Sequence, residues 1–195
     1  MRTLGLACLL APAALAGAAK EPPMKTSPPS EIVAGLIQVE TPPGWRRTTY
    51  SNAAGADLVV AFERGADRLV VRVFGAKGSF YKTPADFLAG PAATTMGREA
   101  QKRGAAPVAG RPLALYRRRF PLAQGGPHES SSARPRMGAE SFCVLAPFKD
   151  GRFIVLSHQR ESPVADPERL GEIAWEAFLR GARLLPVKTN IGRKP

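Results

Sequence analysis

The 195 residues carry a formal charge of +12, an ordinary hydrophobic fraction of 44%, two cysteines, 19 glycines and 19 prolines. This length fits one domain with a real core, and two cysteines exclude a disulfide-rich scaffold. The excess of positive charge favours acidic partners such as nucleic acid, anionic lipid headgroups or envelope polymers, although the basic residues are spread along the chain.

Residues 1–19 have the pattern of a signal peptide. A positive Arg2 precedes an apolar run that is too short to span a bilayer, and small residues follow it. We predict cleavage near Ala16 to Ala19 and export to the periplasm or the extracellular space. Cleavage lowers the charge only to +11 and leaves Cys143 as the one cysteine, so the mature chain forms no internal disulfide. A retained N-terminal anchor and lipid attachment at Cys8 are the alternatives.

The proline-rich residues 20–31 are predicted to be a disordered linker. Strand-like patterns follow at residues 32–40, 45–50, 56–64, 68–75, 113–120, 140–148 and 152–159. Residues 56–64 and 68–75 alternate apolar and polar positions around Gly65-Ala66-Asp67, which predicts an antiparallel hairpin. Asp150-Gly151 is a turn signal that predicts a last hairpin.

Three helical segments are predicted. Thr83-Pro84-Ala85-Asp86 has the residues of a helix start, and residues 92–102 form a second piece. The final helix is capped at Asp166-Pro167-Glu168. Its apolar stripe, predicted to face the sheet, consists of Leu170, Ile173, Ala174, Ala177, Phe178 and Gly181.

Two stretches carry almost nothing to bury. Residues 122–138 are expected to form a mobile surface loop, and residues 186–195 a basic tail. The remaining residues, 32–185, are predicted to form a single α+β domain. It is expected to have an antiparallel sheet of about six to seven strands, with helices packed on it, including a C-terminal helix.

The order of elements over residues 31–185 resembles the PsbP-like superfamily. The resemblance rests on Pro43-Gly44-Trp45 after a strand, a helix from Thr83 to Leu88, the Asp150-Gly151 hairpin, and a closing helix that ends Phe178-Leu179-x-Gly181-Ala182-Arg183. This superfamily includes the photosystem protein PsbP, the Ran-binding Mog protein and the envelope protein DcrB. The resemblance implies an antiparallel sheet with packed helices and a role in binding, and it transfers no residue-level function.

Catalytic chemistry has little support. A two-residue turn at Asp150-Gly151 would place Cys143 opposite His158, as a thiolate and its base, but Pro147 makes this register doubtful. The alternative is a small core cysteine, with His158 near the sheet edge. Two distant histidines and one thiol do not suggest a zinc site. We therefore expect no enzyme, no metal and no cofactor.

An arginine-rich strand is the remaining candidate site. Tyr116, Arg117, Arg118 and Arg119 lie on the predicted strand, and Arg134 and Arg136 follow in the loop. These groups could hold phosphates or carboxylates, or they could be the solvated charges of an edge strand. We predict a monomeric, exported, non-enzymatic envelope protein that binds an unknown protein or envelope component. The alternative is a binder of an anionic polymer through residues 116–120 and 134–136.

Overall fold

The computed structural model describes residues 29–51, 56–90, 100–121, 137–161 and 169–186. The strands are β1 (Ser30–Val33), β2 (Ile37–Glu40), β3 (Arg46–Ser51), β4 (Leu58–Arg64), β5 (Asp67–Phe74), β6 (Gln101–Val108), β7 (Arg111–Pro121), β8 (Met137–Val144), β9 (Phe153–Arg160) and β10 (Arg183–Leu184). The helices are α1 (Pro84–Ala89) and α2 (Leu170–Gly181).

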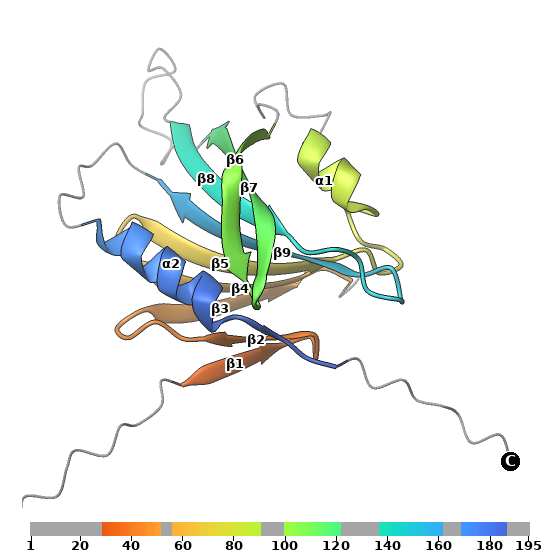
Figure 1. Ribbon diagram of the computed structural model, residues 1–195, viewed down its shortest axis with the longest axis horizontal. Helices are drawn as coiled ribbons and strands as arrows, with labels where there is room; N and C mark the ends of the chain where they lie inside the picture. The colour runs from red at the N-terminus through yellow and green to blue at the C-terminus, as the bar shows by residue number, and fades with distance from the viewer. Residues whose placement is uncertain (1–28, 52–55, 91–99, 122–136, 162–168, 187–195) are drawn as a thin grey trace, which may run out of the picture.

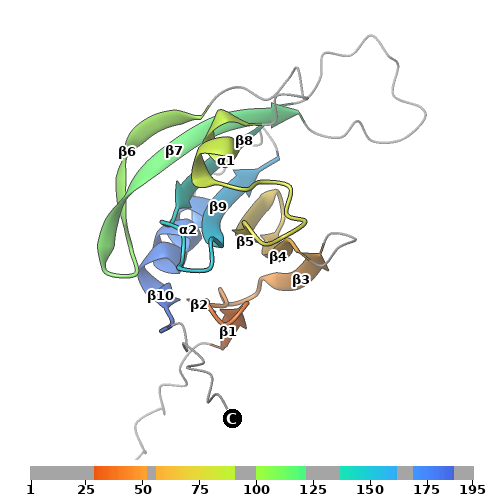
Figure 2. The same cartoon turned by 90° about the vertical axis from the view of Figure 1, so that its right-hand side faces the viewer.

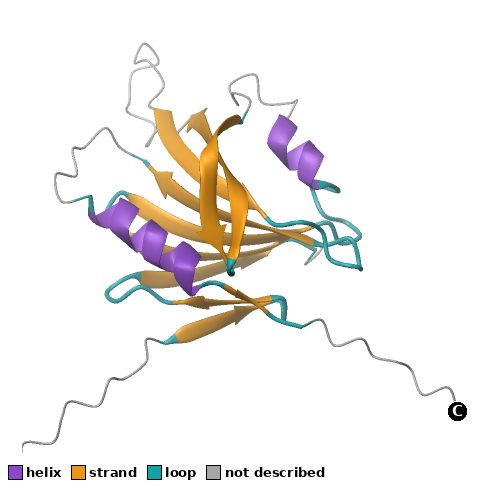
Figure 3. Ribbon diagram, viewed as in Figure 1, coloured by secondary structure: helices purple, strands orange, loops and turns teal. Residues whose placement is uncertain are grey.

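The fold is α+β, as predicted. A seven-stranded antiparallel sheet has the order β3-β4-β5-β9-β8-β7-β6, and a three-stranded antiparallel sheet has the order β1-β2-β10. Figure 3 distinguishes the helices from the strands by colour. Helix α2 packs against β2, β5, β6 and β9, and the long β6–β7 ribbon curves strongly at one side of the large sheet (Figures 1 and 2).

The β4–β5 hairpin confirms the clearest sequence pattern. Arg64 pairs with Asp67 across the turn, and Phe62 pairs with Leu69. Both apolar residues are fully buried, whereas Arg72 lies on the opposite face of the sheet. Because side chains alternate along a strand, the apolar positions of both strands reach the same core.

The two faces of the large sheet carry separate apolar clusters. One cluster joins the large sheet to α2 and to the small sheet, with Phe62, Leu156 and Phe178 among its members. The other is aromatic and joins the opposite face to α1, where Phe87 packs on Phe74 and Phe142. Each helix therefore fixes a different face of the sheet.

Helix α1 begins as the sequence predicts. The Thr83 hydroxyl accepts a hydrogen bond from the Asp86 N–H, and the Asp86 carboxylate accepts one from the Thr83 N–H. Pro84 occupies the first turn. This reciprocal arrangement satisfies N–H groups that a helix start leaves free.

The expected strand over residues 32–40 is two strands. β1 and β2 form a hairpin closed at Ala34 and Gly35, which both have positive φ angles, and the Leu36 N–H donates to the Val33 carbonyl at 3.0 Å. β1 begins at Ser30, so the predicted linker ends two residues earlier than expected. Apolar residues on both sides of Gly35 concealed the turn, because both strands contribute to the core.

The prediction of a helix over residues 92–102 is wrong at its end. Gln101 and Lys102 belong to β6, and the earlier part of the predicted helix lies outside the described residues. β6 has few apolar residues and is held by its pairing with β7, with a bulge between Lys102 and Gly104. β7 therefore lies between β6 and β8, so the interpretation of residues 113–120 as an edge strand is wrong.

Helix α2 is rotated relative to the predicted stripe. Gly171, Trp175, Phe178 and Leu179 are its buried residues, whereas Leu170 is 41% and Ile173 is 59% exposed. Trp175, which was not part of the predicted stripe, packs toward the core, whereas Leu170 and Ile173 of that stripe do not. The predicted cap at residues 166–168 lies outside the described residues.

The last hairpin has a longer connection than a two-residue turn. β8 ends at Val144 and β9 begins at Phe153, and the intervening turn closes where the Phe148 N–H donates to the Arg152 carbonyl at 2.7 Å. Cys143 therefore pairs with Leu156, and His158 pairs with Ser141. β9 is the central strand of the sheet, so His158 is not at an edge.

The predictions for the loop, the signal peptide, the linker and the tail fall mostly on residues that the structure does not describe. Gly138 and Met137 belong to β8, whereas residues 122–136 of the predicted loop are outside the described part of the chain. The predicted signal peptide, residues 20–28 of the linker, and residues 187–195 of the tail are outside it as well.

Candidate functional site

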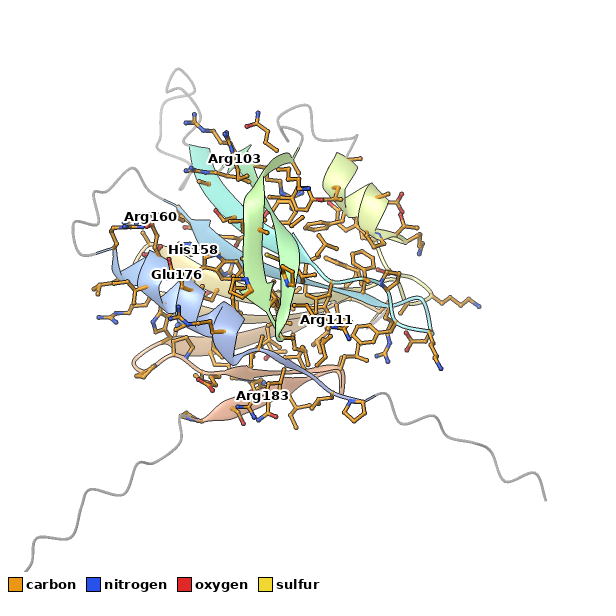
Figure 4. The ribbon with its side chains drawn as sticks, in the orientation of Figure 1. Arg103, Arg111, His158, Arg160, Glu176 and Arg183 are labelled. Carbon is orange, nitrogen blue, oxygen red and sulfur yellow. The ribbon has the colours of Figure 1, made fainter. Side chains whose placement is uncertain are left out.

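A recess of about 230 Å³, lined by both polar and apolar side chains, lies between α2 and strands β7, β8 and β9, and we call it the helix cleft. Figure 4 labels three of its residues, with Glu176 on the helix and His158 and Arg160 on β9. The lining residues are Leu115, Arg117, Ala139, Ser141, His158, Arg160, Glu172, Trp175 and Glu176.

Strand register builds the floor of the helix cleft. Arg117 pairs with Ser141, and Ser141 pairs with His158, so these three residues form one row across β7, β8 and β9. Paired residues of neighbouring strands point to the same face of a sheet. Arg160, two residues beyond His158, continues the same face of β9. A guanidinium, a hydroxyl and an imidazole therefore lie side by side.

Helix periodicity builds the opposite wall. Glu172, Trp175 and Glu176 are three and four residues apart, and this spacing places them on one side of a helix. The two glutamates are exposed, whereas the Trp175 side chain is buried. The helix cleft thus has basic groups on its sheet side and carboxylates on its helix side.

The imidazole of His158 is held in a fixed orientation. Its Nε2 atom lies 2.7 Å from Asp67 Oδ1, and its ring stacks on Trp175 with centroids 6.3 Å apart. His158 is only 7% exposed. A ring nitrogen engaged by a carboxylate, with the ring face covered, is positioned by the fold.

Gly171 makes room for the Asp67 carboxylate beside the first turn of α2. A Cβ atom at Gly171 would lie 2.4 Å from the Asp67 carboxyl carbon, closer than atoms can approach. The N-cap residue Arg169 makes no side-chain capping bond. Negative charge near a helix N-terminus is favourable, so Asp67 stabilises both the His158 ring and the start of α2.

The arginine-rich strand divides between the two faces of the sheet, as its alternation predicts. Arg117 and Arg119 are exposed, and Arg117 faces the helix cleft. Tyr116 and Arg118 lie on the other face, where Tyr116 stacks on Phe142 at 5.6 Å. The sequence-predicted residues Arg134 and Arg136 lie outside the described residues.

Arg118 is engaged inside the fold. Its Nε donates to Glu140 Oε2 at 2.7 Å, and its Nη1 donates to the Phe87 carbonyl at 3.3 Å. The guanidinium also lies over the Phe87 and Phe142 rings, 4.5 and 4.9 Å from their centroids. These contacts join β7 to α1 through a cation that is partly removed from water.

Glu140 connects Arg118 to a second arginine. Arg72 Nη1 donates to Glu140 Oε1 at 2.8 Å, and Gln159 Nε2 donates to the same oxygen at 3.0 Å. Burial by itself would raise the pKa of Glu140, but the charges of Arg72 and Arg118 outweigh it and lower the pKa to about 2. The carboxylate is therefore ionised at neutral pH.

A third exposed arginine lies beside Arg117. Gln101 pairs with Arg117, and Arg103 Nη2 donates to Gln101 Oε1 at 2.6 Å. Arg103 is the residue at which the register of β6 shifts. No sequence pattern singles out Arg103 or Arg160, since neither stands in a cluster along the chain and only strand pairing places them near Arg117.

Cys143 is not placed for nucleophilic chemistry. It is fully buried, and burial raises the pKa of its thiol to about 11. Its cross-strand partner is Leu156. Cys143 is therefore a small core residue, as the alternative prediction stated.

Within the part of the chain that the structure describes, His, Cys, Asp and Glu side chains form no group of three placed to bind a metal ion. Over the same residues, no helix is both long enough and apolar enough to cross a bilayer.

Comparison with known proteins gives a distant likeness to a solved structure. No family model matches the chain, and none of the curated proteins matches it. Among solved structures, it is similar to LpqN of Mycobacterium tuberculosis, which is described as involved in cell envelope biogenesis. The two share 16% identity over 77% of this chain and 83% of LpqN, with a TM-score of 0.39. A likeness of this size carries no argument about function.

Proposed function

We propose that this chain is an exported, non-enzymatic protein of the cell envelope, with a PsbP-like binding domain. Its helix cleft receives a charged group of a partner protein or another envelope component. The leader pattern of residues 1–19 supports export, and the order of elements supports the family relation.

The arrangement of charge in the helix cleft carries the proposal. Arg117 lies on its sheet side, and Glu172 and Glu176 lie on its helix side, around the fixed His158 ring. A preformed recess with a few convergent polar groups is typical of a recognition site. The Cys143 thiol is buried in the core between the large sheet and α2, and the groups exposed in the helix cleft favour binding.

Site-specific photo-crosslinking in intact cells tests the proposal. A photoreactive amino acid replaces Glu176 at the helix cleft or, as the matched control, Arg183, an exposed residue on β10 away from it (Figure 4). We expect a discrete adduct from position 176 that Arg117→Glu removes, and no such adduct from position 183. Equal adducts from both positions, or none from either, would contradict the proposal.

A second candidate function is the binding of an anionic polymer, namely nucleic acid, lipid headgroups or envelope polysaccharide. The exposed Arg103, Arg117 and Arg119 favour it, and Arg134 and Arg136 of the adjoining segment would extend the basic surface. Arg118 would contribute by holding the strand in place, since Glu140 already binds its guanidinium.

The salt dependence of binding distinguishes the two candidates. Each phosphate contact to a single strand adds about 0.7 to the slope of log affinity against log salt. With a fluorescent single-stranded oligonucleotide, the double variant Arg117→Glu, Arg119→Glu should lower the slope by about 1. The matched double variant Arg111→Glu, Arg183→Glu should leave it unchanged. Equal losses in both variants would point to nonspecific attraction by the whole chain.

A further inference from the structure

A second recess, of about 430 Å³, lies on the other flank of α2, and we call it the apolar groove. One wall is the connection between β2 and β3, and the other wall is the helix. Its apolar lining consists of Pro42, Pro43, Trp45, Leu170, Ile173, Ala174, Ala177 and Phe178. Glu40, Thr41 and Arg64 complete the lining with polar side chains.

Helix α2 exposes an apolar stripe to this groove. Ile173 is 59% and Leu170 is 41% exposed, and Ala177 is exposed beside them. These three residues are half of the six-residue stripe that the sequence predicted to face the sheet. Contiguous exposed apolar surface beside an aromatic side chain such as Trp45 is typical of a contact site.

We propose that the proline-rich residues 20–28 of the same chain occupy the apolar groove. The place where this segment joins the fold supports the proposal. The Thr41 N–H donates to the Pro29 carbonyl at 2.8 Å, so the chain enters β1 beside Glu40 and Thr41, which line the groove. An extended chain spans about 3.1 Å per residue, so nine residues reach nearly 28 Å, enough to follow the groove.

The chemistry of the segment fits this lining. Lys-Glu-Pro-Pro-Met-Lys-Thr-Ser-Pro contains three prolines and a methionine, and its two lysines can approach the Glu40 carboxylate at the rim. Proline-rich segments lose little entropy on docking and are recognised in grooves lined by aromatic side chains. Attachment to β1 also gives the segment a high effective concentration, so weak contacts suffice.

Docking would place the tether along the helix whose other side forms the helix cleft. Residues 20–28 would then cover Ile173 and Leu170. The docked tether would also shorten the distance between the domain and the N-terminal end of the exported chain. The apolar groove shares no residue with the helix cleft, so this inference does not depend on what the helix cleft binds.

Disulfide trapping in the full chain tests the proposal. The background variant is Cys8→Ser, and Cys143 remains because it is fully buried. Met24→Cys is combined with Ile173→Cys in the apolar groove or, as the control, with Arg183→Cys. Arg183 is exposed on β10, whose partner strand β2 also pairs with β1, so the segment starts close to both sites.

We expect an intramolecular disulfide to form with position 173 at least tenfold faster than with position 183. Replacing Pro22 and Pro23 by glycine should lower the rate at position 173 and leave the rate at position 183 unchanged. Equal rates at the two positions would overturn the proposal, because they would describe an undocked tether. Disulfides that form only between molecules would overturn it in favour of a second copy as the occupant.

Discussion

At the scale of single residues, the ion pairs of Glu140 on the α1 face of the large sheet account for Arg118, the middle one of three consecutive arginines. Glu140 is 2% exposed and joins Arg72 to Arg118 across strands β5, β8 and β7. A buried carboxylate of this kind is stable only when it is paired and hydrogen-bonded. The cluster is therefore a structural use of Arg118, whereas Arg117 and Arg119 are exposed on the opposite face.

Replacing Glu140 tests this interpretation. Glu140→Gln leaves two guanidinium groups without their shared counterion, and we expect it to destabilise the fold by about 3–5 kcal/mol. Urea unfolding measures the change. The matched control, Glu176→Gln, removes a carboxylate that is 63% exposed and should change the unfolding free energy by less than about 0.5 kcal/mol. Similar losses in both variants would show that the buried pairing is unimportant.

The pH dependence of stability follows from the same carboxylate. The pKa of Glu140 falls from 4.5 to about 2 on folding, so its stabilising contribution is complete above the unfolded value and is lost as pH falls toward 2. The shift corresponds to about 3 kcal/mol. Unfolding of the parent between pH 5 and 2 should show this loss. In Glu140→Gln, the fall in stability over that range should be smaller by this amount, and an unchanged fall would contradict the assignment.

Cys143 gives a second prediction for a single side chain. Burial raises the pKa of its thiol to about 11 and covers the sulfur. In the Cys8→Ser chain at pH 8, alkylation by iodoacetamide should be at least about 100-fold slower in the folded protein than in denaturant. Rapid alkylation of the folded protein would show an accessible thiolate and would reopen the case for thiol chemistry.

At the scale of elements, α2 presents three different sides to its surroundings. Trp175 and Phe178 face the core, the exposed glutamates face the helix cleft, and Ile173 faces the apolar groove. Periodicity alone predicts a helix and an apolar stripe. It did not predict the rotation, because Leu170 and Ile173 have the same spacing as residues that are buried.

The contact between α2 and β5 can be tested by a double-mutant cycle. Gly171→Ala places a Cβ atom against the Asp67 carboxylate and should destabilise the fold by about 1–3 kcal/mol. In the Asp67→Ala background the clash is absent, and the same change should be neutral or stabilising because alanine favours helix. Denaturant unfolding of the four proteins measures the coupling.

Gly181→Ala, at the last residue of the same helix, is the control. There the added Cβ atom meets the side chain of Glu40 at 3.0 Å or more, and this side chain is able to move. Its cost should be smaller than that of Gly171→Ala. Additive effects of Gly171→Ala and Asp67→Ala would contradict the close packing of Asp67 against the helix.

The predictability of each element depends on where its stabilising contacts lie. The hairpin of β4 and β5 and the cap of α1 were predicted correctly, because their signals are alternation and a four-residue capping pattern. β6 was missed, because residues 101–108 have no alternating apolar pattern and form a strand through their pairing with β7. Much of the helix cleft was missed for the same reason, since its residues meet only through register.

At the scale of the whole molecule, the proposed function depends on export. Cleavage near residues 16 to 19 should give an exported chain whose intact mass matches a start between residues 17 and 20. Mass spectrometry of the protein purified from the cell envelope measures it. A mass that includes lipid at Cys8 would assign the chain to a membrane surface, and a full-length cytoplasmic chain would contradict export.

The sequence by itself determined the α+β class, the β4–β5 hairpin and the start of α1, because these depend on residues that are close together in the chain. Only the tertiary structure decided the register of β8 against β9, the side of α2 that is buried, and the partners of Arg118 and His158. These features depend on residues that are distant in the chain. Their positions are set by strand pairing and packing, which no local pattern specifies.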